Sequence, residues 1–222
     1  MKRLLIIGAG LAAVLSAGQA YAVPTCTSTL ASTNGETFTV GAAVGDIHAG
    51  VCVQAADKLY GDFGLSGNQP PTSIVFSWSA PVGGTHTIAL NDGYAGGATG
   101  ATVTGLGFQV EDTTPGSNIL TLDGDFLQST PTTSTLVKTS TPGGTGTIDL
   151  TKVGPIPSGP NLITYSGVND ITVSETLTLG VNASVSAVEN TITESTPTIP
   201  EPASLAILGA GLFGLSLLRR RR

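Results

Sequence analysis

The stretch that decides the fold is ITVSETLTLGVNASV, residues 171–185. Its odd-numbered positions are all apolar apart from Glu175, and the positions between them up to residue 178 are Thr or Ser. An alternation of period two places apolar side chains on one face of a strand and polar side chains on the other. The segment therefore predicts a half-buried β-strand whose inner face carries a single acidic residue, Glu175.

Similar short segments recur through the middle of the chain, with turn residues between them. We expect strands at 37–40, 73–79, 85–91, 101–111, 118–123, 134–139, 146–151, 162–165, 171–179 and 183–193. Turns are expected at 91–93, 123–125, 142–144 and 158–160, and any helix at 53–60 would be brief. About ten short strands at fairly regular spacing predict an all-β domain, an antiparallel β-sandwich or jelly roll.

Charge is distributed unevenly along the chain. Six of the nine basic residues lie at positions 2, 3 and 219–222, in the two end segments. Between these ends, only Lys58, Lys138 and Lys152 oppose all fifteen carboxylates. A domain this acidic repels a phosphate backbone, so we expect no nucleic-acid partner.

The N-terminal segment, residues 1–22, has the three parts of a signal peptide. Lys2 and Arg3 precede an apolar stretch at 4–15, and Ala20 and Ala22 form a small-x-small cleavage site. We expect signal peptidase to cut after Ala22 and the domain at 23–196 to be exported. Export reaches an oxidising compartment, where the only two cysteines, Cys26 and Cys52, are predicted to form a disulfide.

The C-terminal segment, residues 197–222, reads PTIPEPASLAILGAGLFGLSLLRRRR. A helix over the uncharged positions 203–218 would be about 24 Å long, against about 30 Å for a hydrocarbon core. The four residues that follow it are Arg219, Arg220, Arg221 and Arg222. The positive-inside rule then predicts a transmembrane helix at 203–218 in the inner membrane, with the arginines in the cytoplasm and the domain facing the periplasm.

Pro200, Glu201 and Pro202, followed by a short apolar helix and a terminal arginine cluster, resemble the PEP-CTERM sorting signal. The resemblance implies recognition and cleavage by exosortase. It also implies delivery to the cell surface or the exopolysaccharide matrix, as a structural or biofilm-associated protein. A plain single-pass anchor with a proline-rich linker is the alternative.

A second, looser resemblance follows Cys52. The segment Asp57-Lys58-x-Tyr60-x-x-Phe63 is similar to a short pattern found in many PEP-CTERM proteins of unassigned function. We expect Tyr60 and Phe63 to be buried beside the disulfide, and Asp57 to cap the backbone or pair with Lys58.

The sequence predicts no catalytic residue, metal site or cofactor. His48 and His86 lie in no recognisable motif, and we expect them at exposed loop or strand positions. Glu111 and Asp112 would point to opposite faces of a strand end, unlike a catalytic pair. The acids of 123–125 could offer oxygens to calcium, but a turn explains them better.

Two alternatives of other classes remain open. One is a carbohydrate- or calcium-binding adhesin module, for which Trp78 would be the main stacking platform. The other, more distant, is a matrix polysaccharide hydrolase built on a pair of the many carboxylates.

Overall fold

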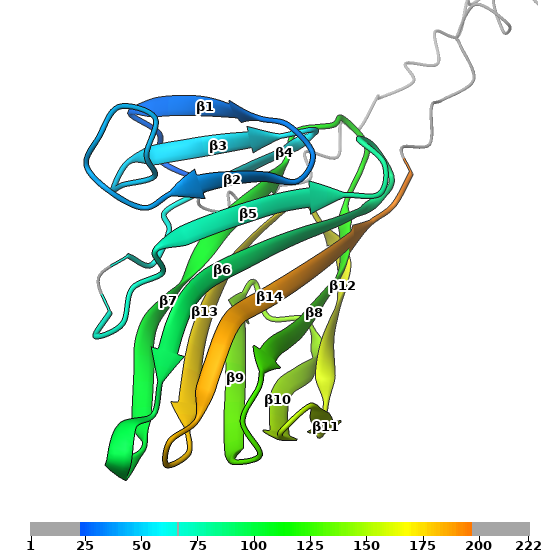
Figure 1. Cartoon of the computed structure of the whole chain (residues 1–222). Helices are drawn as coiled ribbons and strands as arrows, with labels where there is room; N and C mark the ends of the chain where they lie inside the picture. Colours follow the sequence, from blue (N-terminus) through cyan, green and yellow to red (C-terminus); the bar gives the residue numbers. More distant parts are fainter. Residues whose placement is uncertain (1–22, 66, 197–222) are drawn as a thin grey trace, which may run out of the picture.

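The structure is a computed structural model that describes residues 23–65 and 67–196 (Figure 1). The predicted signal peptide with Ala20 and Ala22, the helix at 203–218, the Pro200–Pro202 motif and the arginine cluster lie outside the described residues. Within the part that is described, no helix has the length and apolar character needed to cross a membrane.

The described residues form β-strands and one short 3-10 helix. The strands are β1 (Ser28–Ser32), β2 (Glu36–Thr39), β3 (Val51–Ala55), β4 (Lys58–Gly61), β5 (Ser73–Trp78), β6 (Thr85–Ala95), β7 (Ala101–Asp112), β8 (Ile119–Gln128), β9 (Thr133–Thr141), β10 (Thr145–Val153), β11 (Ile156–Ser158), β12 (Asn161–Val168), β13 (Asp170–Leu179) and β14 (Ser184–Glu194). The 3-10 helix η1 is Gly97–Thr99.

All the strands belong to one mixed sheet that nearly closes into a barrel (Figure 1). The strand order is β1-β3-β4-β7-β13-β9-β10-β12-β8-β14-β6-β5-β2, and β11 pairs with β10 off this path. Strand pairs are antiparallel except β1–β3, which is parallel. The predicted all-β class is confirmed. The structure corrects the expected antiparallel sandwich in two respects. Backbone pairing continues around the bend through β10, β12 and β8, so the strands form one sheet, and the β1–β3 pair makes that sheet mixed.

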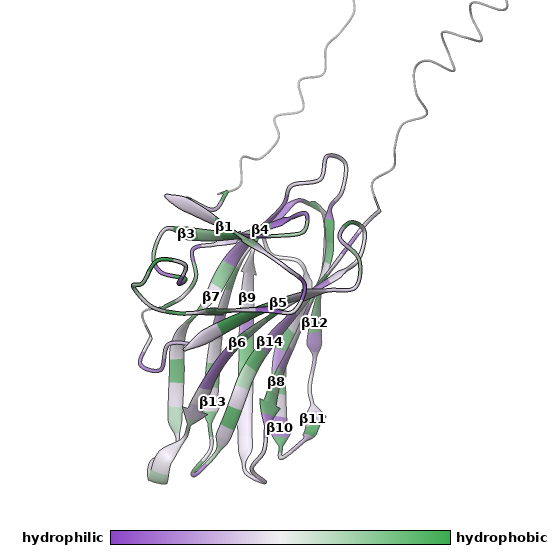
Figure 2. Ribbon diagram, turned by 45° about the horizontal axis from the view of Figure 1, so that its top comes forward, coloured by the Kyte–Doolittle hydropathy of each residue, from purple (hydrophilic) through white to green (hydrophobic). Residues whose placement is uncertain are grey.

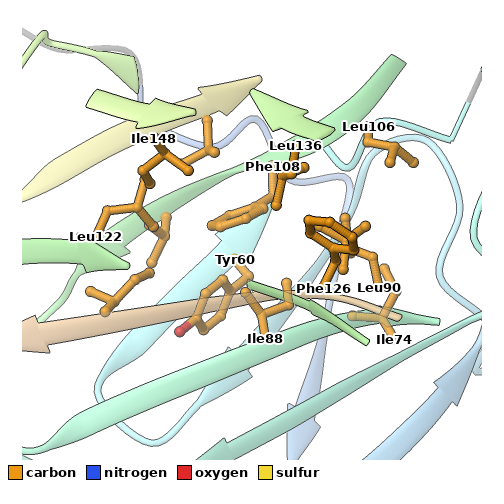
Figure 3. Packing of buried hydrophobic residues seen from close by; sticks show 14 of the residues in the cluster. Tyr60, Ile74, Ile88, Leu90, Leu106, Phe108, Leu122, Phe126, Leu136 and Ile148 are labelled. Carbon is orange, nitrogen blue, oxygen red and sulfur yellow. The ribbon is translucent and has the colours of Figure 1, made fainter. Parts of the chain in front are cut away.

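The core lies between the two walls of this curled sheet. Figure 3 shows side chains from both walls facing one another, including Tyr60, Phe108 and Leu122. The Tyr60 ring of β4 lies 5.1 Å from the Phe76 ring of β5, and 6.0 Å from that of Phe108 on β7. Since β4 and β5 stand near opposite ends of the strand order, burial of these rings holds the sheet in its curled form.

The alternation at 171–185 becomes the strand pair β13–β14. Ile171, Val173 and Leu177 are buried, and the Thr and Ser residues between them face outward. The bands of alternating hydropathy along the strands in Figure 2 show the same pattern. Val181 departs from it, with 50% of its surface exposed, because it lies in the turn between the two strands.

The brief helix considered for 53–60 does not form. This segment is a hairpin of β3 and β4, joined by a two-residue turn in which Ala56 has a φ of 57°. Val51, Val53 and Ala55 follow a strand period and are buried, so packing against the core favours the strand over a short helix.

Two of the four expected turns are wrong. Residues 91–93 lie inside β6, where they form a bulge opposite β14. Residues 123–125 lie inside β8, where Gly124 is buried and a Cβ added to it would lie 2.6 Å from Cε of Lys138. This glycine therefore makes room for a lysine side chain rather than for a turn. The turns at 142–144 and 158–160 do separate strands, as predicted.

The structure joins Cys26 to Cys52 by a disulfide, as the sequence predicts. The two residues are 26 positions apart and fasten the first residues of the domain to β3. Tyr60 is fully buried one strand away, and Phe63 is half-buried against Phe76. The expected packing of Tyr60 and Phe63 in this region is therefore present.

Changing Cys26→Ser and Cys52→Ser together should lower the free energy of unfolding by about 3.5 kcal/mol, because the unfolded chain regains the entropy of an open loop. Urea denaturation of the oxidised protein and the double variant measures this difference. Equal urea midpoints for the two proteins would contradict the assignment.

Candidate functional site

All three lysines of the described residues are buried, which the sequence did not foretell. Lys58, Lys138 and Lys152 are between 0% and 6% exposed. Residues 23–196 contain no arginine, so the outer surface of the described part carries carboxylates and no lysine or arginine charge. Burying an ammonium group is costly unless it is paired and hydrogen-bonded. Each lysine should therefore mark a built polar site in the interior.

The Lys58 site gathers three carboxylates around one ammonium group. Nζ of Lys58 lies 2.9 Å from Oδ1 of Asp57, 3.3 Å from Oδ2 of Asp112, and in close contact with Oε2 of Glu194. Lys58 begins β4, Asp112 ends β7 and Glu194 ends β14. The cluster therefore joins the two walls of the sheet at one end of the molecule.

His86 of β6 completes this cluster. Its Nε2 lies 3.3 Å from Asp57 Oδ1 and 3.3 Å from Glu194 Oε1, although neither ring nitrogen has an aligned hydrogen bond. The indole of Trp78 stacks on the imidazole, with ring centres 6.2 Å apart. His86 is 1% exposed, so the expectation of an exposed position is wrong for it. His48 is exposed, as expected.

The cluster shifts the pKa values of two of its carboxyl groups in opposite directions. Burial raises the pKa of Asp112, even though Ser117, Thr114 and Lys58 act against it. Burial would also raise the pKa of Glu194, but contacts with His86, Lys58 and the Gly84 backbone N–H outweigh it and lower that pKa. The cluster therefore favours the anionic form of Glu194 beside the buried ammonium group.

Residues just beyond Glu194 are fastened to the neighbouring β7–β8 loop. The Ser195 backbone N–H donates to the Asn118 carbonyl oxygen at 2.9 Å, and Asn118 N–H donates to Ser195 Oγ at 3.0 Å. Ser117 Oγ donates to the Ser195 carbonyl oxygen at 2.9 Å. These bonds hold the point at which the chain leaves the folded domain toward Pro200. An open depression of about 560 Å³, lined by residues 111–118 and Asn169, lies beside it.

Asp57, His86 and Glu194 are the one group of metal-ligand types that gathers in the described residues, with ligand atoms within 4.8 Å of one another. A divalent cation there would lie beside the ammonium group of Lys58, which already contacts both Asp57 and Glu194. The ammonium group supplies the positive charge that a cation would bring. The donor set therefore fits a structural ion cluster better than a metal centre.

The Lys138 site also joins strands that do not pair with each other, since Lys138 is on β9 and its partner Asn190 is on β14. Nζ of Lys138 on β9 donates to Glu175 Oε1 at 3.1 Å, to Asn190 Oδ1 at 2.7 Å and to the Glu189 carbonyl oxygen at 2.9 Å. Glu175, the acid on the apolar face of 171–185, stands directly opposite Lys138 in the β9–β13 pairing. It is 3% exposed, and its burial is explained by this partner.

Lys152 of β10 reaches β8 in the opposite wall. Its Nζ lies 2.5 Å from Asp125 Oδ1, donates to the Phe126 carbonyl oxygen at 2.6 Å, and stands 5.1 Å above the Phe126 ring. Asp123 accepts from Asn161 Nδ2 at 3.1 Å. The two acids considered for calcium thus have lysine and asparagine partners within the fold.

Sequence reasoning found part of these sites. The predicted Asp57–Lys58 pair is present, and Glu111 and Asp112 point to opposite faces at the end of β7, as expected. Asp112, Glu194 and Asn190 were missed. They are far from their lysines in sequence. The rarity of lysine in the domain is the one sequence signal that could have indicated a specific partner for each lysine.

The described residues form an all-β domain, and the segment that follows it in the sequence carries a known sorting signal. Residues 198–222 match the PEP-CTERM protein-sorting motif. The chain therefore carries a PEP-CTERM signal, which implies export, sorting at the membrane and processing by exosortase. No curated protein and no solved structure matches the chain.

Glu194→Gln should lower the free energy of unfolding at pH 7 by about 1.5–3 kcal/mol, the size of a hydrogen bond to a charged group. Because the folded-state pKa of Glu194 is lowered, its contribution is present above the unfolded pKa of about 4.3 and is lost as pH falls below it. The difference in free energy of unfolding between wild type and variant should therefore be smaller at pH 3 than at pH 7. Urea denaturation at pH 7 and pH 3 measures it.

Asp149→Asn is the matched control, since Asp149 is exposed on β10. It should change stability by less than about 0.5 kcal/mol at either pH. A Glu194→Gln effect that is equally small, or that grows on acidification, would contradict the role given to Glu194.

Proposed function

We propose that this protein is a non-enzymatic structural component of the cell surface or exopolysaccharide matrix, delivered there by exosortase. The observation that carries the proposal is the PEP-CTERM match at 198–222, directly after the folded domain. Signal peptidase would release the N-terminus after Ala22, and exosortase would act near Pro200, Glu201 and Pro202. The precursor would be anchored in the inner membrane and face the periplasm.

The charge arrangement supports a structural role. With Lys58, Lys138 and Lys152 turned inward, the outer surface of the described residues is uniformly acidic or neutral. Such a surface stays soluble and repels other anionic polymers, which suits a domain embedded in a hydrated matrix. The buried charges join opposite walls, so they stiffen the domain rather than form an accessible reaction centre.

The point of chain exit supports processing close to the domain. Thr196 is the last described residue, and Pro200 lies four positions further along the chain. Fully extended, four residues reach at most about 14 Å. A processing enzyme that acts on the motif must therefore work near the end of the domain at which Glu194 and Ser195 are fastened.

The adhesin alternative gains no support from Trp78. One face of its indole stacks on His86, and the side chain is half-buried in the sheet. A sugar-binding platform needs an exposed aromatic face. We therefore keep the structural role as the proposal.

Replacing Pro200, Glu201 and Pro202 together by alanine should leave the protein in the membrane with its arginines intact. The native protein, in contrast, should begin at Val23 and end near Pro202. Intact mass and C-terminal sequencing of both forms, recovered from the native host, measure this.

Pro197→Ala is the matched control, because Pro197 lies just before the matched motif. It should be processed like the native chain. A native protein that still carries Arg219 to Arg222 would contradict exosortase processing and leave a tail-anchored periplasmic domain.

A further inference from the structure

The Lys138 site contains more than an ion pair, because its amine contacts both a carboxamide and a carboxylate. Lys138 Nζ lies 2.7 Å from Asn190 Oδ1 and 3.1 Å from Glu175 Oε1. All three side chains are buried, with Asn190 fully so. We propose that Lys138 and Asn190 form an intramolecular amide cross-link, with Glu175 moving the protons and ammonia leaving.

The first argument is geometric. A carbonyl bond of about 1.23 Å and an ordinary angle at the oxygen place Asn190 Cγ roughly 3.5 Å from the lysine nitrogen. Reacting atoms held about 3–3.5 Å apart in a fixed orientation react with very high effective molarity. Lys138 comes from β9 and Asn190 from β14, so the fold itself brings the amine and the carboxamide together.

The second argument is the set of unpartnered atoms. Asn190 Nδ2 and Glu175 Oε2 are buried with no hydrogen-bond partner. Unsatisfied buried polar atoms are rare and costly in a native interior. The amide orientation is fixed by the network, since Nδ2 in place of Oδ1 would set two donors against each other. Loss of Nδ2 as ammonia removes one of these two unpartnered groups.

The third argument is the environment of the amine. Burial lowers the pKa of Lys138, although Glu175, Asp123 and Asp125 act in the opposite direction. A neutral amine is the nucleophilic form, and the lowered pKa means that the Lys138 ammonium group loses its proton more easily. Gly124 leaves the space that the lysine stem occupies, because a Cβ there would lie 2.6 Å from Lys138 Cε.

The reaction balances within the site apart from the ammonia released. Glu175 accepts a proton from the Lys138 ammonium group, and the neutral Nζ attacks Asn190 Cγ to form a C–N bond. Glu175 returns the proton to Nδ2, the bond between Cγ and Nδ2 breaks, and ammonia leaves. The new amide nitrogen gives its second proton to Glu175, which ends as the neutral acid. One amide replaces another, so no oxidant or other co-reactant is required.

The cross-link would reinforce the strand that leads to the tail. Asn190 lies on β14, four residues before Glu194 and the chain exit. A covalent bond from β14 to β9 would carry tension applied at the C-terminus across the domain, instead of leaving it to hydrogen bonds alone. This inference does not depend on exosortase, and its test is independent of the sorting experiment.

Mass spectrometry of the full exported protein, denatured and digested with trypsin, tests the cross-link. The expected mass is about 17 Da below that of the unmodified chain, the mass of one ammonia. Trypsin should fail to cut after Lys138, and the peptide 59–152 should stay joined to the peptide that begins at Val153 and contains Asn190. A full-mass chain that trypsin cuts after Lys138 would overturn the proposal and leave an ion pair only.

Variants assign the roles. Asn190→Ala removes the acceptor and Glu175→Gln removes the proton carrier, so both should restore the full mass and the cleavage after Lys138. Asp149→Asn, which changes an exposed acid on β10 outside the site, is the control and should keep the cross-link. A Glu175→Gln protein that still loses ammonia would remove Glu175 from the mechanism. If a variant fails to fold, the wild-type peptide map alone still decides whether the bond exists.

Discussion

The constraint on which the rest of the structure depends is that each lysine of the domain spans the interior. Lys58 on β4 reaches Glu194 on β14, Lys138 on β9 reaches Asn190 on β14, and Lys152 on β10 reaches Asp125 on β8. In every case this partner lies on a strand with which the lysine's own strand does not pair. The apolar core supplies most of the driving force for folding, while these contacts fix how the two walls are aligned.

This arrangement has a consequence for the surface and for the tail. Because all three lysines of the described residues are buried, the charged side chains on the described surface are carboxylates, and this surface is acidic. Two of the three lysines act on β14, the strand that ends just before the sorting segment. The strand that precedes the PEP-CTERM segment in the sequence is therefore held by two of the three buried lysines.

Much of the fold could be predicted because strands follow local chemistry. The alternation at 171–185 and the turn residues at 142–144 and 158–160 are local signals, and each lies where expected. Failures came where a distant contact decides a local conformation. Gly124 is typical of a turn in sequence, but in the structure it faces the stem of Lys138. Residues 91–93 form a bulge instead of a turn because β6 continues past them and pairs with β14. Glu175 was recognised as an exception on its face, whereas its partner depends on a register that the sequence does not reveal.

Amine-selective acetylation of the folded protein, read out by peptide mass spectrometry, tests the central claim most directly. Buried, paired amines react slowly, so we predict that the chain-terminal amine is labelled while Lys58, Lys138 and Lys152 are not. Lys58 and Lys152 should become labelled once the protein is unfolded in urea, which confirms that the reagent can reach them. Rapid labelling of these lysines in the folded protein would contradict the account, because it would place their charges on the surface and leave the two walls without their polar contacts.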